Sequence, residues 1–361
     1  MSRDPIWSRP ATSLKVKLMS ASSPVISCRN VWKLFGANSE AYLKTLSGNP
    51  SFEEIRAAGH IAAVRDVSLD IAQGEMLVIM GLSGSGKSTF VRCLSRLIDI
   101  TGGEVRVEGQ NIGQMSEKEL INLRRNKMGM VFQSFGLLPH RTVLDNIAFP
   151  LEMRGQDKHT CRARALEVIE LVGLSGREDY FPRELSGGQQ QRVGIARSLA
   201  IEPDIWFLDE PFSALDPLIR REMQDEFLRL QAILGKTIVF ITHDFDEALR
   251  LADRIAIMKD GVVEQCDTPA QIVLNPATEY VAKFTAEIEK SRVVQAQVLA
   301  KPITEASAEG RPIDGTQTIH SLARMLVNDT RDFLPVAAQG GVVSGILNRQ
   351  DALDVLLGAD T

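Results

Sequence analysis

The sequence predicts an α/β fold in which helices cover a parallel β-sheet. The run MLVIM, residues 76–80, is short and fully apolar, as is typical of a central strand buried on both faces of a sheet. Two later stretches, PDIWFLDEP and KTIVFITHD, are also apolar runs that end in polar residues. A helix-rich segment at about residues 134–195 separates the first run from these two. Strand–loop–helix units therefore flank a helical insertion, a pattern that favours a parallel sheet.

Two longer strands are predicted ahead of the first apolar run. Residues 25–36, VISCRNVWKLFG, alternate loosely between apolar and polar side chains and end at a glycine, which predicts a strand. Residues 62–75, AAVRDVSLDIAQGE, predict a second strand that reaches a turn at Gly74. The connecting segment, residues 37–61, is compatible with helix but is broken at SGNPS.

The composition excludes several classes of protein. Of the 361 residues, 44% are apolar and 24% charged, so a buried core is expected rather than global disorder. The net charge of -5 gives no electrostatic case for a nucleic-acid partner. Four cysteines without a CxxC pair argue against a zinc ribbon or a disulfide framework and fit a reducing cytosol. No stretch reaches the roughly 18 to 20 consecutive apolar residues of a membrane span.

The two ends of the chain are expected to differ from its centre. Residues 1–24 lack the continuous apolar core of a secretory signal and predict a disordered tail, with contact to a membrane surface as the alternative. A domain boundary is expected at about residues 285–293. The remainder predicts one small α/β unit, with a helix in TIHSLARMLVND, two strands around a Gly-Gly turn in FLPVAAQGGVVSGIL and a helix in RQDALDVLLG.

The stretch GLSGSGKSTF, residues 81–90, fits the pattern GxxxxGK[ST] between a predicted strand and a helix expected from Lys87 to about Leu97. Its glycines let backbone N–H groups converge on phosphate oxygens, and the start of a helix adds partial positive charge. Lys87 can reach the β- and γ-phosphates of a nucleotide, and Ser88 can bind Mg²⁺. A flexible Gly/Ser linker is disfavoured because apolar segments lie on both sides. The nucleotide-binding residues expected here are Gly81, Ser83, Gly84, Ser85, Gly86, Lys87, Ser88 and Thr89.

An acidic pair ends the strand predicted in IWFLDEP. Ligands of open parallel sheets bind at the carboxyl ends of the strands, which is where Asp209 and Glu210 are expected. Asp209 is placed to hold Mg²⁺ through water, and Glu210 to polarise an attacking water molecule as general base. A surface acidic pair is the alternative for this dipeptide taken alone, but the phosphate-binding pattern upstream favours catalysis.

The stretch LSGGQQQR, residues 185–192, lies between the two nucleotide motifs. With them it resembles the ATP-binding subunits of ABC transporters, and the resemblance covers about residues 25–284. Further short motifs occur in the order of that family. The matching residues are Gln133 in VFQSFGLLPH for the Q-loop, SALD at residues 213–216 for the D-loop, His243 in ITHD for the switch histidine and Phe35 in KLFG for the aromatic that stacks on adenine. Trp32 and Tyr42 are nearby alternatives to Phe35.

The resemblance implies a RecA-like P-loop NTPase core with an antiparallel β subdomain and a helical subdomain, over residues 25–285. Two such domains would pair head to tail, so that each ATP lies between the P-loop of one chain and the LSGGQ segment of the other. The residues offered across the dimer are then Ser186, Gly187, Gly188, Gln189 and Asp216. His243 would hold the attacking water with Glu210, and Gln133 would contact Mg²⁺ and that water. With Lys87, these three make up the expected catalytic residues, and ATP and Mg²⁺ are the implied cofactors.

The same resemblance implies the partners. One P-loop and one signature segment per chain require a second copy of the chain. The pore would come from a separate integral membrane permease, and an importer would also use an external substrate-binding protein. The expected location is therefore peripheral, at the cytoplasmic face of the cell (inner) membrane.

Longer matching stretches point to the cargo. MGLSGSGKST, VFQSFGLLPHRTVLDN and IVFITHDFDEALRLADRIAIMKDG resemble the ATP-binding subunits of importers of quaternary amines such as glycine betaine, proline betaine and choline. An ABC importer of another small solute, such as an amino acid, is the alternative. An exporter motor or a non-transport ABC ATPase is disfavoured, because the sequence shows no fused membrane domain, coiled-coil insertion or second ATPase unit.

The C-terminal segment, residues 286–361, resembles a single CBS (cystathionine β-synthase-type) module. Such modules pair, so one per chain implies pairing across the dimer or with a decayed neighbour at about residues 293–312. Some CBS modules bind adenine nucleotides through a hydroxyl residue and an acid, and the matching positions here are Asn348 and Asp351. Because asparagine replaces the hydroxyl residue, a dimerising role is favoured over nucleotide sensing.

Overall fold

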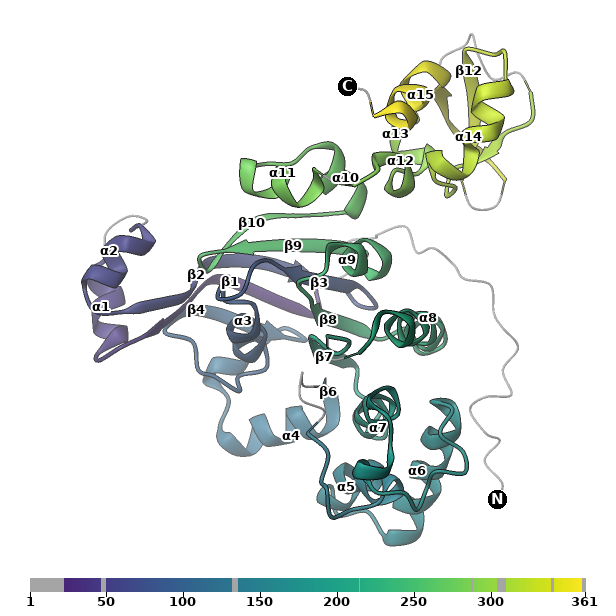
Figure 1. Cartoon of the computed structure of the whole chain (residues 1–361). Coiled ribbons are helices and arrows are strands. Elements are labelled where there is room, and N and C mark those ends of the chain that lie inside the picture. Colours follow the sequence, from purple (N-terminus) through teal and green to yellow (C-terminus); the bar gives the residue numbers. More distant parts are fainter. Residues whose placement is uncertain are drawn as a thin grey trace. The chain divides into compact units, whose positions relative to one another are not determined.

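The structure is a computed structural model that describes residues 23–46, 50–131, 136–213, 215–286, 288–303, 310–338 and 341–358. The chain divides into two compact units, of which the larger spans residues 24–288 and the smaller includes residues 289–361. Figure 1 shows both with most of their elements labelled. The tail predicted to be disordered lies outside the described residues except for its last two positions.

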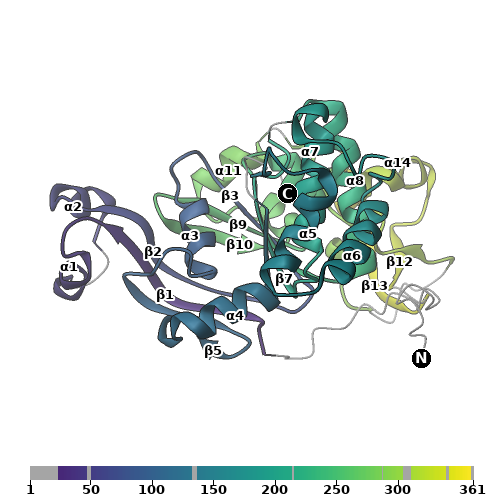
Figure 2. The same cartoon turned by 90° about the horizontal axis from the view of Figure 1, so that it is seen from below.

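An antiparallel sheet forms the N-terminal part of the larger unit. Its elements, with the two helices between its first strands, are β1 (Ile26–Phe35), α1 (Ser39–Thr45), α2 (Phe52–Ala57), β2 (Ile61–Ile71), β4 (Gly102–Val107) and β5 (Gln110–Asn111). The strand order is β2-β1-β4-β5, and Phe35 at the end of β1 lies opposite Ile61 at the start of β2. Both views place α1 and α2 at one end of β1 and β2 (Figures 1 and 2). The antiparallel subdomain implied by the resemblance is confirmed.

The central sheet consists mostly of parallel strands. These are β3 (Met76–Met80), β6 (Met128–Val131), β7 (Ile205–Asp209), β8 (Thr237–Ile241), β9 (Arg254–Lys259) and β10 (Val262–Asp267). The order is β10-β9-β3-β8-β7-β6, and only the β10–β9 pair is antiparallel. Every residue of β3, β7 and β8 is buried, which explains why their sequences are almost unbroken apolar runs. The predicted parallel core is confirmed.

The two faces of the central sheet have different coverings. Leu77 and Ile79 of β3 pack in one cluster with the antiparallel sheet and with α3 (Lys87–Leu94). Val78 and Met80 point to the other face and pack in a second cluster. The helices of that second cluster include α5 (Val143–Met153), α6 (Lys158–Leu171), α7 (Gly187–Leu199), α8 (Pro217–Leu234) and α9 (Phe245–Leu251).

The predicted helical insertion consists of α5, α6 and α7, with a short 3-10 turn, η3 (Pro182–Glu184), ahead of α7. α5 packs against both α6 and α7. A buried side chain, Asn146, ties the segment before α5 to the helix. Its Nδ2 donates to the carbonyls of Leu138, Arg141 and Thr142, and its Oδ1 accepts from the N–H of Leu138. Both its amide nitrogen and its amide oxygen are thus bonded locally, which fixes the entry to the insertion.

An aromatic cluster joins the strands of the central sheet to α8. Trp206, Phe212, Phe227 and Phe240 pack with ring centroids 5.6 to 6.0 Å apart. The indole Nε1 of Trp206 also donates to Ser198 Oγ of α7 at 2.7 Å. These contacts hold β7 firmly just before the acidic pair at its end. The remaining elements of the larger unit are η2 (Ile112–Gln114), α4 (Glu117–Lys127), α10 (Pro269–Leu274) and α11 (Glu279–Thr285).

Several elements differ from the sequence-based expectations, and two helices illustrate this. α3 ends at Leu94 rather than near Leu97, because Arg96 adopts a left-handed φ of 50° and its guanidinium donates to the carbonyls of Ile112 and Met115. α4 was not expected at all. Only Leu120 is buried along this helix, so its sequence carries no apolar stripe.

The smaller unit consists of short helices and a three-stranded sheet. Its elements are α12 (Lys290–Val293), α13 (Ala296–Leu299), β11 (Ile313–Asp314), α14 (Ile319–Asn328), β12 (Phe333–Ala337), β13 (Val343–Asn348) and α15 (Arg349–Leu357). β12 pairs with β11 in parallel and with β13 in antiparallel fashion. The helices and strands predicted for this unit are present, whereas its likeness to a CBS module stays a prediction. Among the described residues of the whole chain, no helix is long and apolar enough to cross a membrane.

Candidate active site

The glycine-rich stretch forms a loop between β3 and α3. Residues 81–86 make the loop, and Lys87, Ser88 and Thr89 lie in the first turn of the helix. Gly86 caps this helix with a φ of 100°, and a Cβ added to it would lie 2.0 Å from the carbonyl oxygen of Ala63. Only glycine fits a position with that backbone angle and that close an approach. The loop therefore brings backbone N–H groups to the start of a helix, as a phosphate site requires.

Lys87 is buried inside the loop that surrounds it. Its Nζ donates to the carbonyl oxygens of Gly81, at 2.8 Å, and Leu82, at 3.0 Å. Burial lowers the pKa of the Lys87 ammonium, while the nearby carboxylates of Glu210 and Asp209 act in the opposite direction. The lysine is thus held at the phosphate loop by contacts that bound phosphate oxygens could replace.

Ser88 and Asp209 meet although they follow different strands. Ser88 Oγ donates to Asp209 Oδ1 at 2.9 Å, and Arg92 Nη2 lies 3.7 Å from Asp209 Oδ2. Burial raises the pKa of the Asp209 carboxyl, and the Ser88 hydrogen bond and Arg92 oppose that rise. A hydroxyl beside a carboxylate fits Mg²⁺, which takes a few protein oxygens and completes its shell with phosphate oxygens and water. The described residues contain no larger cluster of metal-binding side chains.

Glu210 and His243 form a second pair beside the first. Glu210 Oε2 lies 3.2 Å from His243 Nδ1, and the imidazole is 59% exposed. Glu210 has a left-handed φ of 47°, which is strained for a residue with a side chain. Its N–H donates to Ile241 of β8, and its carbonyl accepts from both the N–H and the hydroxyl of Ser213. A strained backbone that is held by several hydrogen bonds is typical of functional positions.

The order of the strands explains this grouping. β3, β8 and β7 are parallel neighbours, so the residues that follow them emerge at one edge of the sheet. That edge carries Lys87 and Ser88, then His243, then Asp209 and Glu210. Gln133 follows β6, the next strand, but lies outside the described residues.

The LSGGQ segment is organised as a helix start. Ser186 caps α7 through a reciprocal pair of hydrogen bonds, in which its Oγ accepts from the N–H of Gln189 and Gln189 Oε1 accepts from the N–H of Ser186. Gly187 and Gly188 form the first turn, where backbone N–H groups have no partner within the helix. Among the described residues, no hydrogen bond or ion pair joins this segment to the phosphate loop.

The family is settled by comparison with known proteins. Residues 64–213 match the family model described as ABC transporter. A protein of Ruegeria pomeroyi named trimethylamine N-oxide transport system ATP-binding protein TmoW is 77% identical over 93% of this chain and 98% of that protein. The chain belongs to the ATP-binding subunits of ABC transporters. The resemblance read from the motifs is therefore confirmed, and this ABC subunit is an ATP-hydrolysing component of a transport system.

Further relatives agree with this placement of the ABC subunit. The glycine betaine/proline betaine transport system ATP-binding protein ProV of Escherichia coli is 44% identical over 92% of this chain and 85% of that protein. A solved dimer of an ATP-binding cassette in a post-hydrolysis state, bound to ADP and phosphate, superposes with a TM-score of 0.57. It is 35% identical and covers 68% of this chain and 98% of that chain. The RecA-like fold class is confirmed.

Three aromatic side chains compete for the adenine-stacking role in the ABC subunit. Trp32 and Tyr42 pack in a small apolar cluster around Leu34, and Tyr42 also stacks on His60. Phe35 is 41% exposed, and Lys33 Nζ lies 5.0 Å from the centre of its ring. Of these three aromatic residues, Phe35 is thus the exposed one, available to stack on a base.

Asp216 serves as the cap of α8 in the ABC subunit. Its Oδ1 accepts from the N–H of Ile219, and Pro217 follows as the first helical residue. Ala214, inside the SALD motif, lies outside the described residues. Asp216 and its neighbour Leu218 are exposed, which leaves this corner free to meet another surface.

Two contacts of the site had no role in the sequence-based prediction. Arg92 reaches Asp209 from one helical turn beyond Ser88, so the i,i+4 spacing on α3 was an available signal. Tyr280 of α11 accepts a long hydrogen bond from the N–H of Leu82 in the phosphate loop, at 3.4 Å. No local pattern could indicate that contact, since nearly two hundred residues separate the partners.

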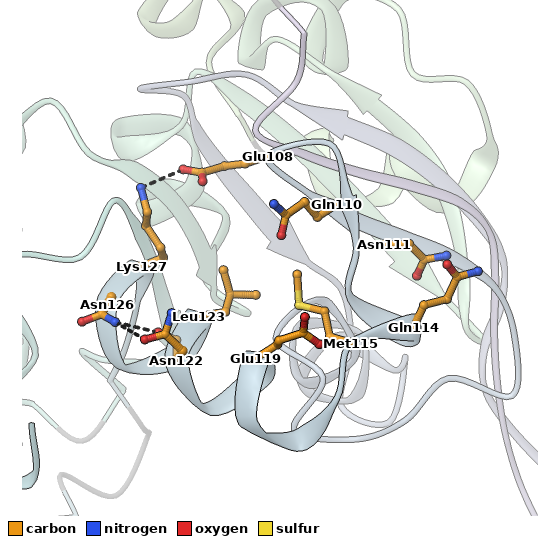
Figure 3. Close-up of a pocket in the computed structure, with 10 residues that line it drawn as sticks. All are labelled: Glu108, Gln110, Asn111, Gln114, Met115, Glu119, Asn122, Leu123, Asn126 and Lys127. Carbon is orange, nitrogen blue, oxygen red and sulfur yellow. Dashed lines mark hydrogen bonds and ion pairs between the residues drawn. The ribbon is translucent and has the colours of Figure 1, made fainter.

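A cavity of about 410 Å³ lies beside α4, away from these motifs. Figure 3 shows its largely amide and carboxylate lining, in which Lys127 pairs with Glu108 and Asn126 with Asn122. None of its lining residues belongs to the predicted site of the ABC subunit. The ATP motifs instead lie along the open carboxyl edge of the central sheet.

Proposed function

We propose that this chain hydrolyses ATP with Mg²⁺ in sites shared between two copies, and that the hydrolysis energises uptake of a small methylated amine, trimethylamine N-oxide first. The observation that carries the chemistry is the alignment of two pairs, Ser88 with Asp209 and Glu210 with His243, at adjacent strand ends. One pair suits a metal and the other suits a water nucleophile.

Each residue then has a role in hydrolysis. The loop N–H groups and Lys87 bind the phosphates, while Ser88 and Asp209 would hold Mg²⁺, which neutralises phosphate charge when bound. Glu210 accepts the proton of the attacking water, and His243 keeps the carboxylate and the water oriented. Gln133, which comes after β6 in the sequence, would complete the metal and water contacts.

The sites are shared because one chain supplies only half of each. The first turn of α7 offers N–H groups and the positive end of a 13-residue helix, without any contact to its own phosphate loop among the described residues. In the pair of chains, Ser186, Gly187, Gly188, Gln189 and Asp216 would face the nucleotide held by the partner. The dimeric state of the solved cassette supports this arrangement.

The relatives indicate the cargo, because no residue of this chain would contact the transported solute. The relative named for trimethylamine N-oxide transport is 77% identical, against 44% for a relative named for glycine betaine and proline betaine. These solutes share a methylated nitrogen. The ATPase would act at the cytoplasmic face of the inner membrane, on a separate permease that receives cargo from an external binding protein.

The smaller unit is proposed to pair with its copy rather than to bind nucleotide. Asn348 Oδ1 already accepts from the N–H groups of Gln350 and Asp351 at the start of α15. Asp351 forms an ion pair with Lys301 at 3.0 Å. Both side chains expected to contact a nucleotide are therefore engaged within the unit.

The test uses the ATPase reconstituted with its permease and binding protein in lipid vesicles. Trimethylamine N-oxide is expected to stimulate ATP hydrolysis more than glycine betaine, choline or proline betaine at equal concentration. The Glu210→Gln complex serves as the control for hydrolysis by this chain. Stimulation by glycine betaine alone would overturn the proposed cargo and leave the ATPase role standing.

A further inference from the structure

The connection between β1 and β2 has no role in the mechanism above, yet its described residues include two helices. Within it, α1 and α2 lie against the strands that they connect (Figure 1). Leu34, Ile55 and Ala62 form the buried centre of a small apolar cluster. The side chains packed around that centre are Trp32, Tyr42, Leu43 and Phe52. The connection is thus anchored on β1 and β2, next to Phe35.

His60 closes the two ends of this connection on each other. This residue is only 8% exposed, and its imidazole stacks on the ring of Tyr42, with centroids 4.1 Å apart and planes 17° from parallel. A Cβ added to Gly36 would lie 2.4 Å from His60 Nδ1, so the Gly36 backbone rests directly on the imidazole. Among the described residues, Nδ1 has no hydrogen-bond partner. Packing rather than hydrogen bonding at Nδ1 accounts for its position.

This contact lies beside the aromatic ring proposed to meet the nucleotide base. Phe35 precedes Gly36, Ile61 follows His60, and Phe35 and Ile61 are opposite each other in the sheet. Two residues further along β2, the carbonyl of Ala63 touches Gly86 of the phosphate loop. The pair of Phe35 and Ile61 is therefore only about 7 Å along the strand from the phosphate loop, at ~3.4 Å per residue.

We propose that residues 37–46 and 50–60 act as a clamp on the base-binding ring, and that His60 is the positioning residue of this clamp. The inference rests on the proposed function, in which Phe35 stacks on adenine. A long unstructured connection would leave Phe35 at the end of a mobile loop. With Gly36 seated on His60, and His60 seated on Tyr42, the ring faces the base in one fixed orientation. Less conformational freedom is then lost when ATP binds.

The test compares two ligands of the full-length protein with Mg²⁺, by titration calorimetry. ATP needs both the phosphate loop and the base-binding ring, whereas inorganic tripolyphosphate needs the loop alone. The informative quantity is therefore the ratio of the two dissociation constants. General damage to the fold weakens both ligands together and leaves this ratio unchanged, and thermal unfolding of each variant reports such damage directly.

Phe35→Ala is expected to weaken ATP about fivefold or more, as loss of one base–aromatic stack does, with tripolyphosphate unchanged. His60→Ala should shift the ratio in the same direction, by about threefold or more. His60→Phe, which keeps a flat ring against Tyr42 and Gly36, should restore the ratio of the unmodified protein. Tyr42→Ala removes the stacking partner of His60. If His60→Ala does not fold, the ratio measured for Tyr42→Ala tests the clamp instead. Arg56→Ala, at an exposed position of α2, is the matched control.

The outcomes separate the base-binding role of Phe35 from the clamp centred on His60. A changed ratio in Phe35→Ala with an unchanged ratio in folded His60→Ala and Tyr42→Ala overturns the clamp and leaves Phe35 as the base-binding ring. An unchanged ratio in Phe35→Ala overturns the role of Phe35 and the clamp with it. A changed ratio in all three, rescued by His60→Phe, is the result that the clamp predicts.

Discussion

The carboxylate of Glu210 lies 3.2 Å from Nδ1 of His243, although the two residues follow different strands. β7 and β8 run parallel, with Asp209 opposite Ile241, so both side chains leave the sheet at the same edge. The strained backbone of Glu210 is held by bonds to Ile241 and Ser213. Bonds of this kind would keep Glu210 in place while ATP is bound and released, as its proposed role of general base requires.

Replacement of Glu210 by glutamine should uncouple binding from hydrolysis. Glutamine keeps the shape of the side chain but cannot accept the proton of the attacking water, so turnover should fall about 100-fold or more while ATP still binds. Unhydrolysed ATP should also hold the two copies together, which size-exclusion chromatography would detect as a persistent dimer. Glu108→Gln, at the exposed partner of Lys127, is the control carboxylate. Brisk turnover by Glu210→Gln would contradict the role of general base.

Replacement of Asp209 by asparagine should stabilise the nucleotide-free protein while abolishing hydrolysis. Burial raises the pKa of the Asp209 carboxyl, so the folded state disfavours its ionised form at neutral pH. Removing that charge should add about 1 kcal/mol to the free energy of unfolding at pH 7. The gain should shrink as the pH falls through the raised pKa, and it should vanish once the carboxyl is protonated in both states. Urea unfolding at several pH values measures this, and a gain that grows toward low pH would contradict the account.

Replacement of Gly86 by alanine should destabilise the fold far more than the same change two residues earlier. The added Cβ of Gly86→Ala would collide with the carbonyl of Ala63, and the backbone angle of Gly86 also opposes it. We expect a loss of about 3 kcal/mol or more in the free energy of unfolding. Gly84→Ala meets nothing within 4 Å and carries only the strain of a positive φ, so about 1 kcal/mol is expected. Equal losses of unfolding free energy in Gly86→Ala and Gly84→Ala would contradict the close contact between β2 and the phosphate loop.

The smaller unit should show no nucleotide site of its own. With the phosphate loop filled by saturating tripolyphosphate and Mg²⁺, calorimetry with AMP should give no saturable binding. Asn348 and Asp351 are already bonded within the unit, and breaking those bonds would oppose binding. Saturable AMP binding that Asp351→Ala removes would instead establish a nucleotide-sensing module.

The sequence could predict the elements whose burial is reflected in their own residue pattern. β3, β7 and β8 are buried on both faces, so their apolar runs and the polar residues after them were readable. α4 was not, because it buries little more than Leu120. The exposure of Phe35 and the packing of Trp32 and Tyr42 depend on contacts of α1, α2 and β2, which no local pattern encodes. The left-handed backbone of Glu210 is likewise set by its bonds to β8 and Ser213.

The central claim is that each ATP site is built from two chains, and mixing two inactive variants tests it most directly. Lys87→Ala damages the phosphate loop, and Ser186→Arg removes the cap of α7 and places a bulky charge at its start. Differently tagged copies would be co-expressed and purified as mixed pairs, and single-turnover hydrolysis would be measured. If the sites are shared, each mixed pair contains one site with both halves intact, so it should hydrolyse ATP where neither variant does so alone. Mixed pairs as inactive as the separate variants would contradict a shared site.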